Sequence, residues 1–111
     1  MDKLRTKYKA CIEACLRAHS AAQFCAAACL KEEHLHMMRN CIQLDNECAT
    51  ICLATASLLN MQSPFVFSIL PLCAEICASC AAECEKHDNE HCQQCAVLCK
   101  HCAEECRQLA A

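Results

Sequence analysis

The sequence contains no glycine and no tryptophan, and only two prolines. Because glycine and proline are the residues that most often interrupt helices, their scarcity favours long, uninterrupted helices. Without glycine, the chain is also poorly suited to form the knuckles and turns that usually present the four ligands of a zinc site. Large apolar side chains are scarce too, since aromatics make up 4% of the chain and much of its hydrophobic content is 19 alanines and 16 cysteines. Burial of such a core stabilises a fold only weakly.

The chain also has no large excess of positive or negative charge. The formal net charge is -3 with acids and bases interspersed, so there is no basic stripe for nucleic acid and no polybasic membrane anchor. The first twenty residues lack the apolar stretch of an export signal, which predicts a cytoplasmic protein. The apolar stretch from Leu53 to Ala74 is interrupted by Asn60, Gln62, Ser63 and both prolines, so we expect no membrane span.

Cysteine is the residue in excess, at 16 of 111 positions. In the cytoplasm thiols stay reduced, and clustered cysteines there are more often metal ligands or redox groups than disulfides. Seven pairs have the spacing C-x-x-x-C and three have C-x-x-C. Both spacings place the two side chains on the same face of a helix. The pattern therefore predicts helices that each carry a stripe of thiols.

Two helices are predicted in the N-terminal half. Asp2 is a suitable N-cap for a first helix from Lys3 to Glu33, and a second helix runs from Leu35 to Asn60. A turn of about 100° per residue places the cysteines of the first helix within an arc of about 80°. The stripes of these two helices contain Cys11, Cys15, Cys25, Cys29, Cys41, Cys48 and Cys52.

Two more helices are predicted in the C-terminal half. Their bounds are Pro64 to His87, with Ser63 as N-cap, and a fourth helix to Leu109 that Asp88 or Asn89 caps. Their stripes contain Cys73, Cys77, Cys80, Cys84, Cys92, Cys95, Cys99, Cys102 and Cys106. Four helices of similar length with short connections predict an all-α fold, an antiparallel up-down-up-down four-helix bundle with a cysteine-lined core. We expect a single domain spanning residues 1–111.

Counting residues from the end where helices one and two, and three and four, are joined predicts layers of thiols. The count places Cys48 level with Cys73 and Cys102, and it spreads the ladder over about 30 Å at about 1.5 Å per residue. No cysteine lies between residues 53 and 72. An apolar plug is therefore predicted at the far end, formed by Leu58, Leu59, Met61, Phe65, Phe67, Ile69, Leu70 and Leu72.

Soft metal ions fit such stripes. Two thiolates on adjacent turns, with a third from a facing helix, suit Cu(I), which accepts two or three sulfur ligands. Zinc and iron-sulfur clusters require four ligands around one centre. The leading hypothesis is storage of many Cu(I) ions with no reaction catalysed. The alternatives are a zinc or mixed soft-metal buffer, a thiol-based redox switch or oxidoreductase, a disulfide-linked bundle, and a structural module in which cysteine is a small apolar residue.

The joined end differs from the rest because it collects weaker ligands. Imidazole and thioether hold Cu(I) less tightly than thiolate does, which suits a place of uptake and release. Asp45 lies on the stripe between two cysteines, where a carboxylate is either buried and paired or a ligand. His19 and His101 fall off the stripes and are expected in solvent. The candidate ligands at the joined end are His34, His36, His87, His91, Met37 and Met38.

The C-x-x-x-C repeats on all four helices and the run CAEICASCAAECEKHDNEHCQQCAVLCKHCAEEC make the whole chain resemble the cysteine-rich four-helix-bundle copper storage proteins (Csp family), in their cytosolic branch. The resemblance implies a bundle that takes many Cu(I) ions into its core. It implies filling and emptying at a polar mouth, where a copper chaperone or chelator could exchange metal, and assembly as a homotetramer. It also implies that the 16 cysteines are core ligands, and that His87, His91 and Asp45 are additional ligands on the mouth side.

Overall fold

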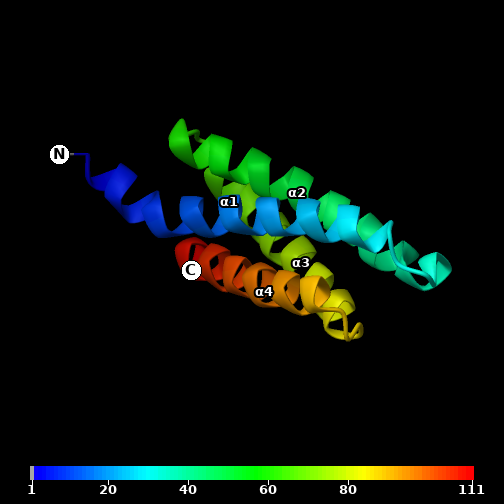
Figure 1. Cartoon of the computed structure of the whole chain (residues 1–111). Coiled ribbons are helices and arrows are strands. Elements are labelled where there is room, and N and C mark those ends of the chain that lie inside the picture. Colours follow the sequence, from blue (N-terminus) through cyan, green and yellow to red (C-terminus); the bar gives the residue numbers. More distant parts are fainter. Residues whose placement is uncertain (1) are drawn as a thin grey trace.

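A computed structural model describes residues 2–111 as four helices (Figure 1). Residue 1, where the predicted domain begins, lies outside the described residues. The helices are α1 Lys3–Cys29, α2 Arg39–Asn60, α3 Val66–Glu85 and α4 Glu90–Ala110, with a short 3-10 helix, η1 Leu35–Met38, before α2. The predicted all-α bundle is confirmed.

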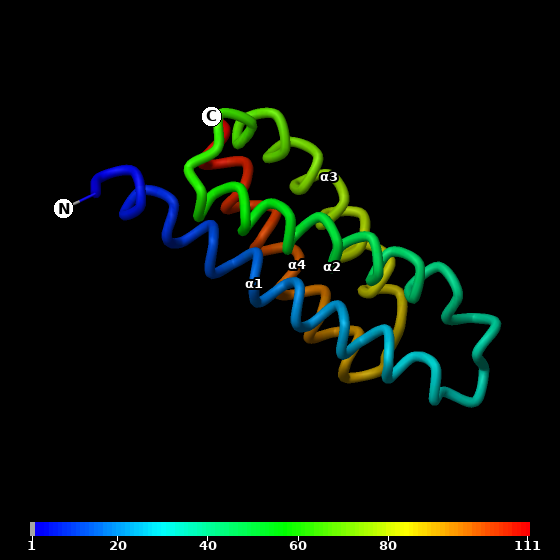
Figure 2. Tube along the Cα trace, turned by 90° about the horizontal axis from the view of Figure 1, so that it is seen from above, coloured from blue at the N-terminus to red at the C-terminus, as the bar shows by residue number. Residues whose placement is uncertain are grey.

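The helices run antiparallel in an up-down-up-down order. Each packs against two neighbours, α1 and α3 both against α2 and α4. Figures 1 and 2 show the α1–α2 and α3–α4 connections at one end and both termini at the other. We call the first the histidine end, defined by residues 30–38 and 86–91. The bundle measures 50 × 20 × 18 Å along its principal axes.

The predicted helix starts are confirmed at two positions and corrected at a third. The Asp2 carboxylate accepts hydrogen bonds from the backbone N–H groups of Leu4 and Arg5 at 3.0 and 3.2 Å. Asn89 occupies the N-cap position of α4, but its side chain makes no capping hydrogen bond. The Ser63 hydroxyl accepts from the Phe65 N–H at 3.1 Å, but α3 begins only at Val66. Residues 63–66 instead form a turn closed by the Val66 N–H and the Ser63 carbonyl.

The α2–α3 turn shows how the chain manages without glycine. Gln62 adopts a φ of 53°, the left-handed conformation that glycine usually supplies after a helix. The Ser63 N–H then bonds to the Leu58 carbonyl at 3.0 Å, and the Gln62 N–H to the Leu59 carbonyl at 3.1 Å. These two bonds satisfy the last carbonyls of α2 in a Schellman arrangement.

The predicted connection between the first two helices was too short. α1 ends at Cys29 rather than at Glu33, and the segment from Leu35 begins as η1 before α2 starts at Arg39. Residues 31–33 favour a helix locally, but α2 must return along α1. The reversal prevails over that local preference and takes residues 30–38 out of the α-helices.

The core is lined by cysteine, as predicted. All sixteen cysteines are buried, with relative exposures of 0–2%, and alanines such as Ala18, Ala22 and Ala103 fill the space between them. α3 continues through Pro71 as one helix. It is the one helix in residues 2–111 that is long and apolar enough to cross a membrane by length and composition, a test that the core helix of a bundle also passes.

The end opposite the histidine end is closed by fewer side chains than predicted. Leu59, Val66 and Leu70 have relative exposures of 0–1%, and Tyr8 of α1 is buried in the same core at 4%. The prediction was wrong for four members of the plug, because Met61, Phe65, Phe67 and Leu72 are 48–67% exposed. They lie on the outward faces of the α2–α3 turn and of α3, where the helical period turns them away from the axis.

Candidate metal centre

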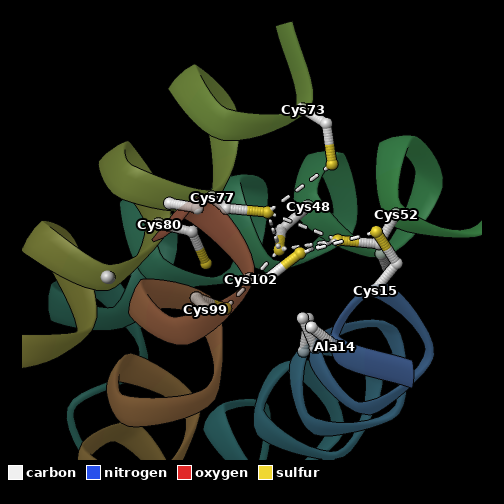
Figure 3. Close-up of a cluster of buried hydrophobic side chains, with 14 of the residues drawn as sticks. Ala14, Cys15, Cys48, Cys52, Cys73, Cys77, Cys80, Cys99 and Cys102 are labelled. Atoms are coloured by element: carbon white, nitrogen blue, oxygen red, sulfur yellow. Dashed lines mark hydrogen bonds between the residues drawn. The ribbon is translucent and has the colours of Figure 1, made fainter. Parts of the chain in front are cut away.

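The sulfur atoms of the four stripes meet along the bundle axis. Figure 3 shows the side chains of Cys48, Cys52, Cys77 and Cys102 converging from α2, α3 and α4. The Cys52 and Cys77 sulfurs are 3.3 Å apart, and the Cys48 and Cys99 sulfurs are 3.5 Å apart. All sixteen cysteines are free thiols. The interior is therefore a continuous column of sulfur with ligand atoms from every helix.

Within the column, five groups of ligand atoms each lie within 4.8 Å of one another. Every cysteine except Cys11 belongs to at least one group, and the Cys11 sulfur is 3.7 Å from that of Cys106. Each group draws on at least three helices. The groups are Cys15, Cys73, Cys102 and Cys106; Cys25, Cys29, Cys41 and Cys92; Cys52, Cys73, Cys77 and Cys102; Cys25, Asp45, Cys84 and Cys95; and Cys48, Cys80 and Cys99.

The four-sulfur groups correct one argument from the sequence. A helix without glycine was expected not to supply four ligands around one centre. Yet a C-x-x-x-C pair from one helix and single thiols from its neighbours bring four sulfurs together. Sulfurs at the corners of a tetrahedron with metal-sulfur bonds of about 2.3 Å lie about 3.8 Å apart, which these groups approach. The column thus offers two-, three- and four-coordinate sulfur sites.

The predicted layers need a shift of one helical turn in α2. Cys48 was expected level with Cys73 and Cys102, but its sulfur contacts those of Cys77 and Cys99 at 3.7 and 3.5 Å. The displacement follows from the longer α1–α2 connection. Because α2 begins at Arg39 instead of residue 35, its thiols lie nearer the histidine end than the residue count implied.

Asp45 is a carboxyl side chain within the column, and its relative exposure is 0%. Its Oδ1 atom accepts hydrogen bonds from the thiols of Cys80, Cys95 and Cys84 at 3.3, 3.4 and 3.6 Å. Its Oδ2 atom faces the Cys41 sulfur at 3.8 Å. Burial first, and then the neighbouring Cys95 and Cys84, raise the pKa of Asp45 to about 8. The carboxyl group is buried and paired with thiols, which is the first of the two alternatives raised for it, and the residue belongs to one of the five groups.

Two thiols near the histidine end, those of Cys29 and Cys92, have raised pKa values. Burial raises the pKa of Cys29, and burial together with the neighbouring Cys29 raises the pKa of Cys92 to about 12. A metal that binds these sulfurs must therefore displace protons.

The two histidines of the α3–α4 connection occupy different positions. The Nδ1 atom of His91 lies 3.4 Å from the Cys25 sulfur and 3.5 Å from the Cys92 sulfur, while its Nε2 atom lies 3.0 Å from Glu32. His87 instead bonds through Nε2 to Glu83, one turn earlier in the chain, at 2.9 Å. The structure thus brings His91 to the sulfur column and leaves His87 beside it.

The remaining candidates near the mouth are separated. His34 and His36 are exposed, with their rings edge to face at a centroid distance of 6.3 Å, and Met37 is 61% exposed. Met38 is instead buried in the core at 4% exposure. The five ligand groups found in residues 2–111 include neither His34 nor His36.

One expectation outside the column was wrong. His19 was expected in solvent, but it is half-buried and its Nδ1 atom bonds to the Ala49 carbonyl of α2 at 2.7 Å. His101 is exposed on α4, as expected.

The sequence analysis did not identify the two glutamates that contact His87 and His91. Glu83 precedes His87 by four residues, a helical spacing that a search for acid-histidine pairs would find. Glu32 and His91 are 59 positions apart, and no local pattern connects them. Val66 and Tyr8, which close the other end, were also missed.

Comparisons with known proteins give a consistent result. A family profile described as "Copper storage protein" matches residues 4–111. The "Uncharacterized cysteine-rich protein YhjQ" of Bacillus subtilis (strain 168) is 48% identical over 103 residues, 93% of this chain and 95% of that protein. The Cu(I)-bound copper storage protein BsCsp3 of B. subtilis is 47% identical, with a TM-score of 0.91 over 95% of this chain and 99% of its own.

A structure of copper loading to a cytosolic copper storage protein from Streptomyces lividans, with five coppers, is 37% identical. It covers 96% of this chain and 94% of its own, with a TM-score of 0.92. That protein also has a structure in which two histidines four positions apart are replaced with alanine. His87 and His91 have the same spacing.

Proposed function

The chain belongs to the copper storage protein family, and from that premise we propose that it stores many Cu(I) ions as thiolate complexes inside its helical bundle. One observation carries the proposal. Fifteen of the sixteen buried thiols fall into groups whose ligand atoms lie within 4.8 Å of one another, drawn from all four helices. A core that served only packing would have no need to place its sulfurs within reach of a shared ion. Such a protein binds and releases metal and catalyses no reaction.

The sixteen cysteines are proposed as the ligands that hold stored copper. Asp45 is proposed as a further ligand near the histidine end, because its Oδ1 atom faces three thiols of the column. His91 and His87 are proposed as the ligands through which Cu(I) reaches these thiols. The exposed His34, His36 and Met37 would meet the ion first, whereas the burial of Met38 supports a packing role for that residue.

Exchange of copper is proposed at the histidine end, with a copper chaperone or a small chelator as donor and acceptor. The proposed setting is the cytoplasm, in keeping with the description of the S. lividans relative as cytosolic. Assembly as a homotetramer is also proposed. It would cover exposed apolar side chains such as Phe24, Leu53 and Phe65. A single domain over residues 1–111 is also proposed, and the family match over residues 4–111 supports it.

Anaerobic titration with Cu(I) against a competing chelator tests storage directly. We expect many equivalents per chain, and fewer than about five would contradict the proposal, given two or three sulfurs per ion. Replacing Cys48, Cys80 and Cys99 together with serine should lower the capacity, because these residues form one of the groups. The matched control is Ala103→Ser, which adds a buried hydroxyl beside the column and removes no thiol.

A zinc or mixed soft-metal buffer is the second candidate, and the four-sulfur groups favour it. The same titration with Zn(II) separates the two functions. Copper storage predicts that Cu(I) displaces bound Zn(II) completely, because the thiolate sites prefer the softer ion. Retention of stoichiometric Zn(II) in excess Cu(I) would establish the buffer instead.

A further inference from the structure

We propose that Glu32 is a positioning residue, which holds His91 in the orientation and tautomer that present its Nδ1 atom to Cu(I) on the way to Cys25 and Cys92. This inference rests on the proposed function and concerns how the column is filled. Nothing in the cysteine pattern points to Glu32, which lies in the turn after α1.

The position of Glu32 is set by the end of α1. The Glu32 N–H bonds to the Cys29 carbonyl at 3.2 Å, so the turn carrying the carboxylate is tied to a residue whose sulfur belongs to the column. From there the side chain reaches the second residue of α4, and its Oε1 atom lies 3.0 Å from the Nε2 atom of His91. The His91 side chain is 13% exposed and that of Glu32 is 34% exposed. The contact therefore joins two connections of the histidine end at the edge of the solvent.

Glu32 determines which nitrogen of His91 carries the proton. A carboxylate can only accept a hydrogen bond, so Nε2 must be the N–H donor in this pair. In the neutral ring Nδ1 is then unprotonated and holds a free lone pair. That lone pair faces the Cys25 and Cys92 sulfurs at 3.4 and 3.5 Å. His91 is thus arranged as a metal ligand before any metal arrives.

The arrangement matches that of metal-binding histidines, which usually donate their second N–H to a carboxylate. The carboxylate fixes the ring and raises its basicity, and its loss typically costs about 10- to 100-fold in metal affinity or activity. Glu83 makes a corresponding contact with His87, but within residues 2–111 no cysteine sulfur lies at hydrogen-bonding distance from the His87 ring, whereas Cys25 and Cys92 lie beside His91. Of the two acids, Glu32 is therefore the one linked to the thiols through its histidine.

Nitrogen NMR of the copper-free, reduced protein tests the tautomer. In ¹⁵N spectra of the protein with labelled histidine, the neutral His91 ring should appear as the Nε2–H form. Glu32→Gln keeps the size of the side chain, but an amide donates as well as accepts, so the His91 signals should shift toward a mixture of tautomers. Glu33→Gln is the matched control, because it makes the same change at the adjacent exposed residue. A wild-type His91 in the Nδ1–H form would overturn the proposal.

Stopped-flow loading from a Cu(I)-chelator complex tests the consequence. Glu32→Gln should slow uptake of the first equivalents about tenfold, while the final copper capacity stays at the wild-type value. Glu33→Gln should load at the wild-type rate. In the His91→Ala background, adding Glu32→Gln should cause no further slowing, because the acid acts through that ring. Equal slowing in both backgrounds, or equal effects of the two glutamate variants, would refute the assignment.

The final capacity keeps this inference separate from the proposed function. A wild-type protein that binds only a few equivalents would contradict storage. A wild-type protein that fills completely, together with a Glu32→Gln variant that fills at the same rate, would contradict only the role of Glu32.

Discussion

The buried carboxyl of Asp45 predicts an unusual pH dependence for the stability of the copper-free protein. Its pKa rises from an ordinary value of 3.8 to about 8 in the folded chain, first because burial disfavours the charged form. The unfolded chain releases this proton near pH 4, whereas the folded chain retains it to about pH 8. The stabilising contribution is therefore fully present below about pH 4 and is lost as the pH rises through about 8.

The magnitude follows from proton linkage. Each pH unit between the two pKa values changes the free energy of unfolding by about 1.4 kcal/mol for one proton. Between pH 5 and 7.5 the copper-free protein should therefore lose about 3 kcal/mol through Asp45 alone. The side chain has 0% relative exposure, so solvent screening does little to reduce this figure.

The variant that isolates the effect is Asp45→Asn, which has nearly the same shape and no titratable proton. In urea unfolding under anaerobic, reducing conditions, the free energy of unfolding of the wild type should fall between pH 5 and 7.5. That of Asp45→Asn should not show this fall. Asp88→Asn makes the same change at an exposed position and should follow the wild type. Equal pH slopes for the wild type and Asp45→Asn would refute the reasoning.

Three further predictions concern packing, a hydrogen bond and the metal. Leu70→Ala should lower the free energy of unfolding by about 2–5 kcal/mol, because it leaves a cavity at a fully buried site. Leu72→Ala, at a 48% exposed site, should lower it far less. Similar losses for the two variants would contradict the described closure of that end. His19→Ala should cost about 1 kcal/mol through loss of its hydrogen bond to the Ala49 carbonyl, whereas the exposed His101→Ala should change unfolding little. Loading with Cu(I) should raise the melting temperature, because an ion bound only by the folded state shifts unfolding by mass action; calorimetry with and without a strong Cu(I) chelator checks this, and an unchanged melting temperature would argue against binding in the core.

The thiol stripes could be predicted because they depend on local geometry. Spacings of three and four residues determine a helical face, and a helix with an apolar face buries it. Asp45 was identified for the same reason, since it shares the phase of Cys41 and Cys48. Fold class, helix number and the inward direction of every cysteine therefore followed from the sequence.

Features that depend on how one helix meets another could not be predicted in this way. The depth of Cys48 relative to α3 and α4 depends on where α2 starts, and the local preference of residues 31–33 for a helix obscured that position. The pairing of Glu32 with His91 arises only when α1 and α4 lie side by side. Ser63 shows an intermediate case, because its hydroxyl does bond to the chain ahead while the helix begins later.

Leu59, Val66, Leu70 and Tyr8 are buried beyond the last thiols at one end of the sulfur column, so that end is closed by apolar side chains. If copper enters and leaves only at the histidine end, as proposed, ions deeper in the column would depart after those nearer that end. The store would then operate as a stack, in which the copper loaded last is returned first. A cell would draw on recently acquired metal while the oldest ions, near Cys11 and Cys106, form a slowly exchanging reserve.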